Sequence, residues 1–272
     1  MESHKIARLV VVGDPSVAKL KNLVAKFISK AKNRHFEFVI TPGGFLSFDF
    51  PEGLESGIDI DKINEKQLQL LQKEAEEVIS DFFSKLKDED FQQLKKIADY
   101  FTIGIDGSNE SGSRHIELIA VYNLKKEKVI RWTGKFYPTE YQKRSLIKFN
   151  DLDSHFIELN SQKIVILGCH DLNVYSPRGQ AKAKQGGYKK EVADKFRLKC
   201  EMFKPDIILQ HPHTTDSPNI WNQPWRMVEK ELSSVKHFAS GIKYYNGDEE
   251  QRGLLDDILE KTKKGDIVDF KK

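Results

Sequence analysis

The sequence predicts an α/β protein. Three observations support this prediction: short apolar, β-branched runs typical of buried strands, longer segments with apolar residues at helical spacing, and an alternation of the two along the chain. The clearest strand is 164–167, and the clearest helix is 61–87, which contains neither Gly nor Pro. The 272 residues show no internal repeat, and we expect them to form one domain, residues 1–272.

The expected elements follow one another in order. The chain opens with a strand at 6–13 and a helix from Val17, entered through Asp14-Pro15-Ser16. A second strand at 36–41 ends at a Pro-Gly-Gly turn, and the aromatic loop 45–53 after it is expected to pack and to line a pocket. The remaining expected helices are 61–87, 88–99, 191–203, 225–233 and 254–261, and the remaining expected strands are 101–106, 115–124, 128–136, 155–159, 164–167, 206–210, 237–245 and 267–270.

The charge balance and the cysteine count exclude some classes of protein. Lys and Arg total 44 against 41 Asp and Glu, and this near-balance argues against a dedicated nucleic-acid binder. No apolar run approaches a membrane span and the N-terminus lacks a signal-peptide pattern, so we expect a cytoplasmic protein without a membrane partner. In a reducing compartment both cysteines, Cys169 and Cys200, are expected to be free thiols.

Cys169 is the candidate nucleophile. It follows the strand 164–167 in the motif Gly168-Cys-His-Asp171, so a rigid sheet would hold the thiol while loops shape a pocket around it. Such a thiol needs a base, an electrostatic partner and an oxyanion site. The plainer interpretation is a small core cysteine, which is how we interpret Cys200 on its amphipathic helix.

The Gly-Cys-His-Asp motif resembles the nucleophile motif of the nitrilase superfamily, the carbon–nitrogen hydrolases. Other segments resemble further motifs of that family, and they occur in the same order over residues 5–246. These segments are the strand and helix at 6–31, the strands 115–123 and 129–135, the segment 203–212 and the Trp-containing helix 221–229. The resemblance implies a four-layer α-β-β-α sandwich, a homodimer, and cofactor-free hydrolysis of a small amide or nitrile through a thioester on Cys169. Lys135 would match the lysine that stabilises the tetrahedral intermediate.

The sequence departs from this family at one catalytic position. Where the family has Pro-Glu, this chain has Pro42-Gly43, so the carboxylate that would serve as general base is absent. General-base assistance is typically worth ~10²–10⁴ in rate. Two outcomes remain open: Asp49 or Glu140 replaces the carboxylate, or the protein is a pseudoenzyme that serves as a binding or scaffold protein. The plain interpretation of both acids is that they are solvated loop charges.

The residues expected to line the substrate pocket, which would take an amide, a nitrile or a carboxylate-bearing ligand, are Gly43, Phe45, His170, Asp171, His211, His213 and Trp221. Near its mouth, residues 178–190 carry five basic residues, no acid and three glycines, which predicts a surface loop.

A metal site is the alternative. His170, Asp171, His211 and His213, with Asp216, make a pattern superficially similar to binuclear metallophosphoesterases. Two bridged metals also need an early Asp-X-His, and here Asp14 is followed by Pro and Ser. The plainer interpretation is that both histidines after the strand 206–210 lie at a pocket rim.

Overall fold

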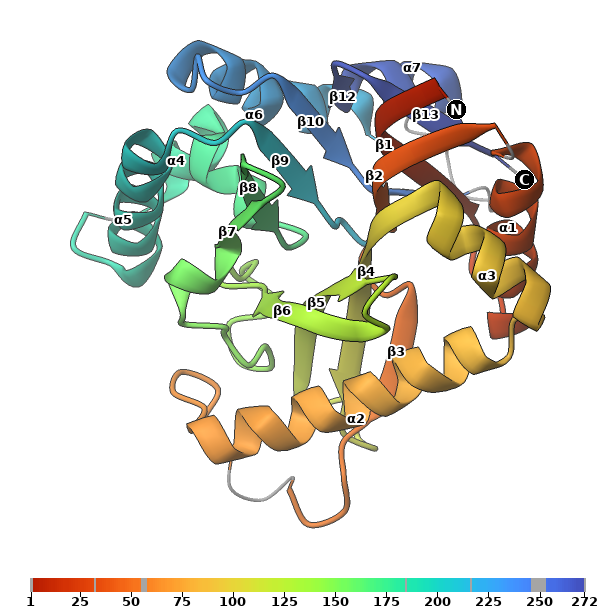
Figure 1. Ribbon diagram of the computed structural model, residues 1–272. Coiled ribbons are helices and arrows are strands. Elements are labelled where there is room, and N and C mark those ends of the chain that lie inside the picture. Colours follow the sequence, from red (N-terminus) through yellow and green to blue (C-terminus); the bar gives the residue numbers. More distant parts are fainter. Residues whose placement is uncertain are drawn as a thin grey trace.

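Two β-sheets packed face to face, with helices on their outer faces, make up the protein (Figure 1). The computed structural model describes residues 2–31, 33–54, 58–183, 185–215, 217–245 and 253–271. The α/β class and the four-layer α-β-β-α arrangement expected from the sequence are confirmed. Among the described residues, no helix is long and apolar enough to cross a membrane.

The first sheet has the strand order β11-β1-β2-β4-β5-β6, with β13 paired to β1 and β3 paired to β4. Its strands β1, β2 and β4 run parallel, whereas β4, β5 and β6 form an antiparallel meander. The strands are β1 (Glu2–Val12), β2 (Arg34–Ile40), β3 (Leu46–Asp49), β4 (Ala98–Ser108), β5 (His115–Asn123), β6 (Lys128–Gly134), β11 (Ile242–Tyr244) and β13 (Ile267–Phe270).

The second sheet has the order β12-β10-β9-β8-β7. Its strands are β7 (Phe156–Leu159), β8 (Gln162–Leu167), β9 (Ile207–Gln210), β10 (His237–Ser240) and β12 (Lys263–Lys264). Strands β8 and β9 are parallel, with Leu167 opposite Gln210. Because the carboxyl ends of parallel strands meet at one edge of a sheet, Cys169 after β8 lies beside the histidines after β9.

Three apolar clusters fill the three spaces between the layers. Strand β8 shows how one strand serves two of them, because Ile164 and Ile166 face the first sheet whereas Val165 and Leu167 face the helices. This strand is therefore buried on both faces, as its continuous apolar run predicts. The cluster on the outer face of the first sheet is the largest and includes Phe45.

The helices cover the two outer faces (Figure 1). On the first sheet lie α1 (Val17–Lys30), α2 (Glu65–Ser84) and α3 (Asp88–Ile97); on the second lie α4 (Pro177–Lys182), α5 (Tyr188–Phe203) and α6 (Pro218–Glu231), and α7 (Leu255–Lys261) packs near β11. Two short 3₁₀ helices are η2 (Leu152–His155) and η3 (Asp171–Tyr175). A capping box between Asn64 and Gln67 starts α2, which explains why this helix begins later than its pattern predicts.

Three sequence-based expectations about local structure are wrong. Residues 178–190 are not a loop: α4 and the start of α5 occupy most of the segment, because the Ser176 side chain caps α4 and Pro177 fits its first turn. The aromatic segment 45–53 packs and lines a cavity as expected, but it is not all loop, because Leu46–Asp49 form the edge strand β3. The expected strand 237–245 breaks at Gly241 into β10 and β11, which belong to different sheets, and a Cβ at Gly241 would meet the Thr41 carbonyl oxygen at 2.3 Å.

Candidate active site

Cys169 lies at the floor of a cavity of about 590 Å³ at the carboxyl ends of strands β8 and β9. Only 3% of the residue is exposed, and its Sγ accepts a hydrogen bond from the backbone N–H of His213 at 3.3 Å. The cavity is also lined by His170, His213, Ile220, Trp221, Lys243 and Tyr245. The structure thus brings together residues from the ends of β8, β9 and β11 and from α6.

Asp171 is a buried clamp within this region. Its carboxylate accepts hydrogen bonds from three backbone N–H groups, those of Gly168 at 2.7 Å, Tyr137 at 2.9 Å and Phe136 at 3.1 Å. Burial raises the pKa of Asp171 to about 7, although these donors oppose the rise. The clamp ties the turn that carries Cys169 to the segment that follows Lys135.

Lys135 is a buried ammonium directly after β6. Its Nζ donates to Glu117 Oε1 at 2.8 Å and to Gln142 Oε1 at 2.6 Å. Burial acts to lower the pKa of Lys135, but the negative charges of Cys169 and Glu117 outweigh it, and the pKa lies above the ordinary value. Lys135 therefore carries a fixed positive charge close to the thiol.

Two carboxylates face the same space from the first sheet. Asp106 on β4 and Glu117 on β5 are directly opposite each other in the antiparallel ladder, an arrangement that is destabilising for like charges unless a cation lies between them. The imidazole of His213 occupies that position: its Nε2 lies 2.8 Å from both Asp106 oxygens and its Nδ1 lies 3.4 Å from Glu117 Oε2.

These contacts set the protonation of the two groups. Burial acts to lower the pKa of His213, but the charge of Glu117 and the hydrogen bond and charge of Asp106 hold it well above the ordinary value. Burial likewise acts to raise the pKa of Glu117, yet the His213 charge, with help from His115 and Lys135, holds it well below the ordinary value. The site is therefore an alternating arrangement of charges that joins the two sheets, with Lys135 and Glu117 buried and His213 and Asp106 partly exposed.

The two thiols of the chain differ in character. Burial acts to raise the pKa of Cys169, but the charge of His170 and hydrogen bonds from the His170 and His213 side chains hold it well below the ordinary thiol value. Cys200 packs in the apolar cluster under α5, where burial raises its pKa to about 12. Cys169 thus has the environment of a thiolate, and Cys200 that of an inert core thiol.

Several candidate residues lie away from this cluster. Asp49 is exposed on the edge strand β3, and Glu140 is exposed and paired with Lys143 at 2.6 Å and Lys189 at 3.2 Å. Glu140 lines a neighbouring cavity of about 430 Å³ together with His170 and Trp221, and within the described residues neither carboxylate is hydrogen-bonded to Cys169. Phe45 packs against Phe82 in the core, His211 is buried behind the cavity, and Asp171 is the clamp described above.

Sequence reasoning missed Asp106 and Glu117. The available signal was a single acid within an apolar strand, Ile116-Glu-Leu118, since a charge at an inward position of a strand is rarely tolerated without a partner. The register that sets Glu117 opposite Asp106 follows from the ladder between β4 and β5 and is not visible in either segment alone.

The residues of the alternative metal site do not form a metal-binding cluster where the structure describes them. In the part of the chain that the structure describes, no group of three or more His, Cys, Asp or Glu residues is placed to hold a metal ion. Backbone N–H groups already occupy the carboxylate oxygens of Asp171. Asp216, the remaining member of that pattern, lies outside the described residues.

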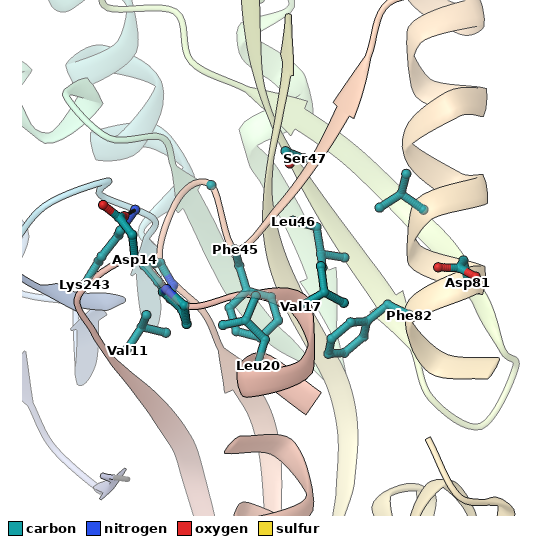
Figure 2. Close-up of a pocket in the computed structure, with 14 residues that line it drawn as sticks. Val11, Asp14, Val17, Leu20, Phe45, Leu46, Ser47, Asp81, Phe82 and Lys243 are labelled. Carbon is teal, nitrogen blue, oxygen red and sulfur yellow. Dashed lines mark ion pairs between the residues drawn. The ribbon is translucent and has the colours of Figure 1, made fainter. Parts of the chain in front are cut away.

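A second cavity, of about 260 Å³, lies between α1, α2 and the start of β3. Figure 2 shows it lined mostly by apolar side chains such as Leu20 and Phe82, with Asp14 and Lys243 at one end. Those two residues form an ion pair at 2.6 Å and also line the Cys169 cavity. The lining of this second cavity includes Ser47 but neither a cysteine nor a histidine, so the candidate active site is the one at Cys169.

Comparison with known proteins supports the fold. The sequence matches no protein-family model and no curated protein sequence. The structure is similar to an amidase from Nesterenkonia sp. AN1 with a covalent acetamide adduct at its active-site cysteine, at a TM-score of 0.51 and 10% identity over 89% of this chain and 76% of that one. It is also similar to a CN-hydrolase superfamily protein from Xanthomonas campestris with an arsenic adduct in its active site, at a TM-score of 0.50 and 12% identity over 92% of this chain and 79% of that one.

A third similar structure belongs to a larger enzyme. It is the glutamine-dependent NAD+ synthetase of Acinetobacter baumannii in complex with ADP, with a TM-score of 0.50 and 14% identity over 88% of this chain. This chain spans only 38% of the synthetase. At these identities the comparisons establish the fold, which is the α-β-β-α sandwich of nitrilase-superfamily proteins.

Proposed function

We propose that the protein is a cysteine-dependent hydrolase of carbon–nitrogen bonds, acting on small amides through a thioester on Cys169. The observation that carries this proposal is the placement of a buried thiol of lowered pKa at the floor of a cavity, beside the fixed ammonium of Lys135. A cavity of about 590 Å³ falls within the range typical of small-molecule sites.

The roles of the residues follow from their charges. The Cys169 sulfur attacks the amide carbon and forms a C–S bond, and the carbonyl oxygen takes up negative charge that Lys135 stabilises. The C–N bond then breaks and the amine leaves with a proton. Water attacks the thioester, releases the carboxylic acid and restores the thiol. A nitrile would enter the same path through a thioimidate.

The second candidate function is a binding or scaffold protein on the same fold. Gly43 favours it, because in this proposal Gly43 stands where nitrilase-superfamily enzymes have the glutamate that acts as general base. Without a proton acceptor, a coupled catalytic set loses nearly all of its activity. As for assembly, the homodimer implied by the resemblance remains part of the proposal, and light scattering at micromolar concentration measures it.

Ammonia release from a panel of small aliphatic and aromatic amides and nitriles tests the hydrolase proposal. We expect turnover with at least one amide, loss of turnover in Cys169→Ala, and retention in Cys200→Ala, the matched control in which the other buried thiol is removed. Mass spectrometry of the quenched reaction should show acyl addition on the peptide that contains Cys169. Equal ammonia release by wild type and Cys169→Ala across the panel would favour the binding protein.

A further inference from the structure

We propose that His213, held by Asp106 and Glu117 and seated against Gly43, is the group that accepts the Cys169 proton and returns it to the leaving amine. This inference rests on the proposed function, because it assigns the missing base of the same site. It also makes a statement about the resting protein: Cys169 and His213 form a thiolate–imidazolium pair, which is measurable without a substrate.

The turn after β2 is shaped around this histidine. A Cβ at Gly43 would meet the His213 ring at 2.9 Å (Cε1) and 3.0 Å (Nδ1), and the His211 carbonyl oxygen at 2.7 Å. A Cβ at Gly44, whose φ is +59°, would meet Asp106 Oδ2 at 2.6 Å. No side chain fits at position 43 while His213 is in place, so glycine there makes room for the imidazole.

Hydrogen bonding fixes the orientation of the His213 imidazole. Because the Nε2–H of His213 donates to Asp106 at 2.8 Å, the nitrogen left to exchange a proton is Nδ1. Nδ1 lies 3.4 Å from Glu117 Oε2, and the His213 backbone N–H donates to Cys169 Sγ at 3.3 Å. Asp106 thus fixes the imidazole at one nitrogen, and the hydrogen bond between the His213 side chain and Cys169 leaves the other nitrogen to Glu117 and the thiol, as a base in a nucleophile–base–orienter set requires.

The charges around His213 favour the same proton transfer. Asp106 and Glu117 bring two negative charges to facing positions of β4 and β5, and Lys135 supplies one positive charge. Moving the Cys169 proton to His213 leaves the net charge unchanged and places an imidazolium between the two carboxylates, where it is stabilised by both. The raised pKa of His213 agrees with this transfer, and His213 adds to the lowering of the Cys169 pKa, to which His170 contributes the larger part.

The proton path balances through both half-reactions. The Cys169 proton passes to His213 Nδ1, the thiolate attacks, and Nδ1–H protonates the nitrogen as the C–N bond breaks. In the second half, His213 takes a proton from the attacking water and returns it to the sulfur as the acid leaves. Asp106 and Glu117 exchange no proton with substrate and are positioning residues.

His170 is the competing candidate, because it also neighbours Cys169 and lines the cavity. Within the described ranges of the chain no carboxylate is paired with it, and its ring lies near Trp221, with 6.2 Å between ring centroids. Nothing therefore fixes one nitrogen of His170 as a donor. This difference in anchoring is why we assign the proton to His213.

The test is the pH profile of Cys169 alkylation by iodoacetamide, followed peptide by peptide between pH 5 and 10. A thiolate of lower pKa is also a weaker nucleophile, so the midpoint of the profile is more informative than the rate at one pH. In wild type we expect a midpoint well below that of an ordinary thiol. In His213→Gln we expect it to move up by at least one pH unit, toward the ~8.5 of a free thiol. Asp106→Asn should move it in the same direction.

The matched control is His35→Gln. His35 is another histidine whose side chain is 28% exposed and paired with an aspartate, Asp99 at 3.5 Å, and it lies at the opposite end of β2 from Gly43. Its profile should equal that of wild type. Urea midpoints establish that each variant is folded, and Asp106→Asn, which keeps His213 itself, carries the test if His213→Gln does not fold.

The outcomes separate this inference from the hydrolase proposal. Unchanged midpoints in both His213→Gln and Asp106→Asn overturn it, as does a midpoint that moves in His170→Gln and not in His213→Gln. If no amide is hydrolysed by wild type but the midpoints move as expected, the proton assignment holds and the hydrolase proposal fails. If wild type hydrolyses an amide, kcat in His213→Gln should fall by ~10²–10⁴ with a smaller change in KM.

Discussion

Replacing Gly43 with alanine tests the packing on which the His213 assignment depends. The new methyl group would lie 2.7 Å from a backbone oxygen and 2.9–3.0 Å from the His213 ring, whereas carbon contacts are comfortable at about 3.5–4.0 Å. Neither neighbour moves easily, because the Gly43 N–H also donates to the Pro212 carbonyl at 3.0 Å and Asp106 holds the ring. The histidine must therefore shift by roughly half an ångström or more to reach ordinary contact.

The magnitude follows from two opposing effects. Inserting a methyl group into packed structure typically costs about 1–3 kcal/mol. Replacing glycine also restricts the unfolded chain, which returns about 0.4–1 kcal/mol. We therefore expect Gly43→Ala to lower the free energy of unfolding by about 1–2 kcal/mol in urea denaturation. We also expect the alkylation midpoint of Cys169 to rise, because the displaced imidazole stabilises the thiolate less well.

Gly53→Ala is the control for this experiment. Gly53 has a φ of +81° and nothing within 4 Å of an added Cβ, so alanine there loses stability through backbone conformation alone, by about 1–2 kcal/mol. It should leave the Cys169 profile unchanged. The reasoning is refuted if Gly43→Ala is as stable as wild type and its Cys169 is alkylated with the wild-type midpoint. A methyl group would then fit at position 43 without displacing His213.

Three further predictions concern buried ionisable side chains, and each is measured by urea denaturation. Lys135→Met and Glu117→Gln should each lower the free energy of unfolding by about 3 kcal/mol, because each leaves the charge of its buried partner unpaired. The double variant should lose less than the sum of the two single losses, and additive losses would contradict the pairing. Burial lowers the pKa of His211 to about 3, below its unfolded value of 6.5, so the unfolded chain binds the proton first as pH falls. The free energy of unfolding of wild type should therefore fall by up to about 4 kcal/mol between pH 6.5 and pH 3. His211→Leu should show a smaller loss, and parallel curves would argue against a buried neutral imidazole. Arg8→Met should lower the free energy of unfolding by about 3–5 kcal/mol, because the fully buried Arg8 on β1 forms an ion pair with Asp269 on β13. A loss below about 1 kcal/mol would show that this ion pair is dispensable.

The strands and helices whose patterns are purely local were predictable. The apolar run of β8 and the Gly- and Pro-free periodicity of α2 each determine a type of element, because one period fits only one regular structure. Prediction failed where capping or a change of sheet decides the outcome. The basic segment 178–190 looked like a loop by charge, yet the cap at Ser176 starts a helix there. At Gly241 one expected strand divides between two sheets, which no periodicity shows.

By itself, the sequence determined the α/β class, the buried strand that ends at Cys169, and the absence of a side chain at Gly43. It does not show which group could replace the missing general-base carboxylate, because the sequence indicates only acids that are near in the chain to Gly43 or Lys135, such as Asp49 and Glu140. Tertiary structure alone placed Asp106 opposite Glu117 and brought His213 from the other sheet into the space that Gly43 leaves open. The physical reason is that strand register and the contact between two sheets are set by pairings between segments far apart in the chain, and no single segment encodes them.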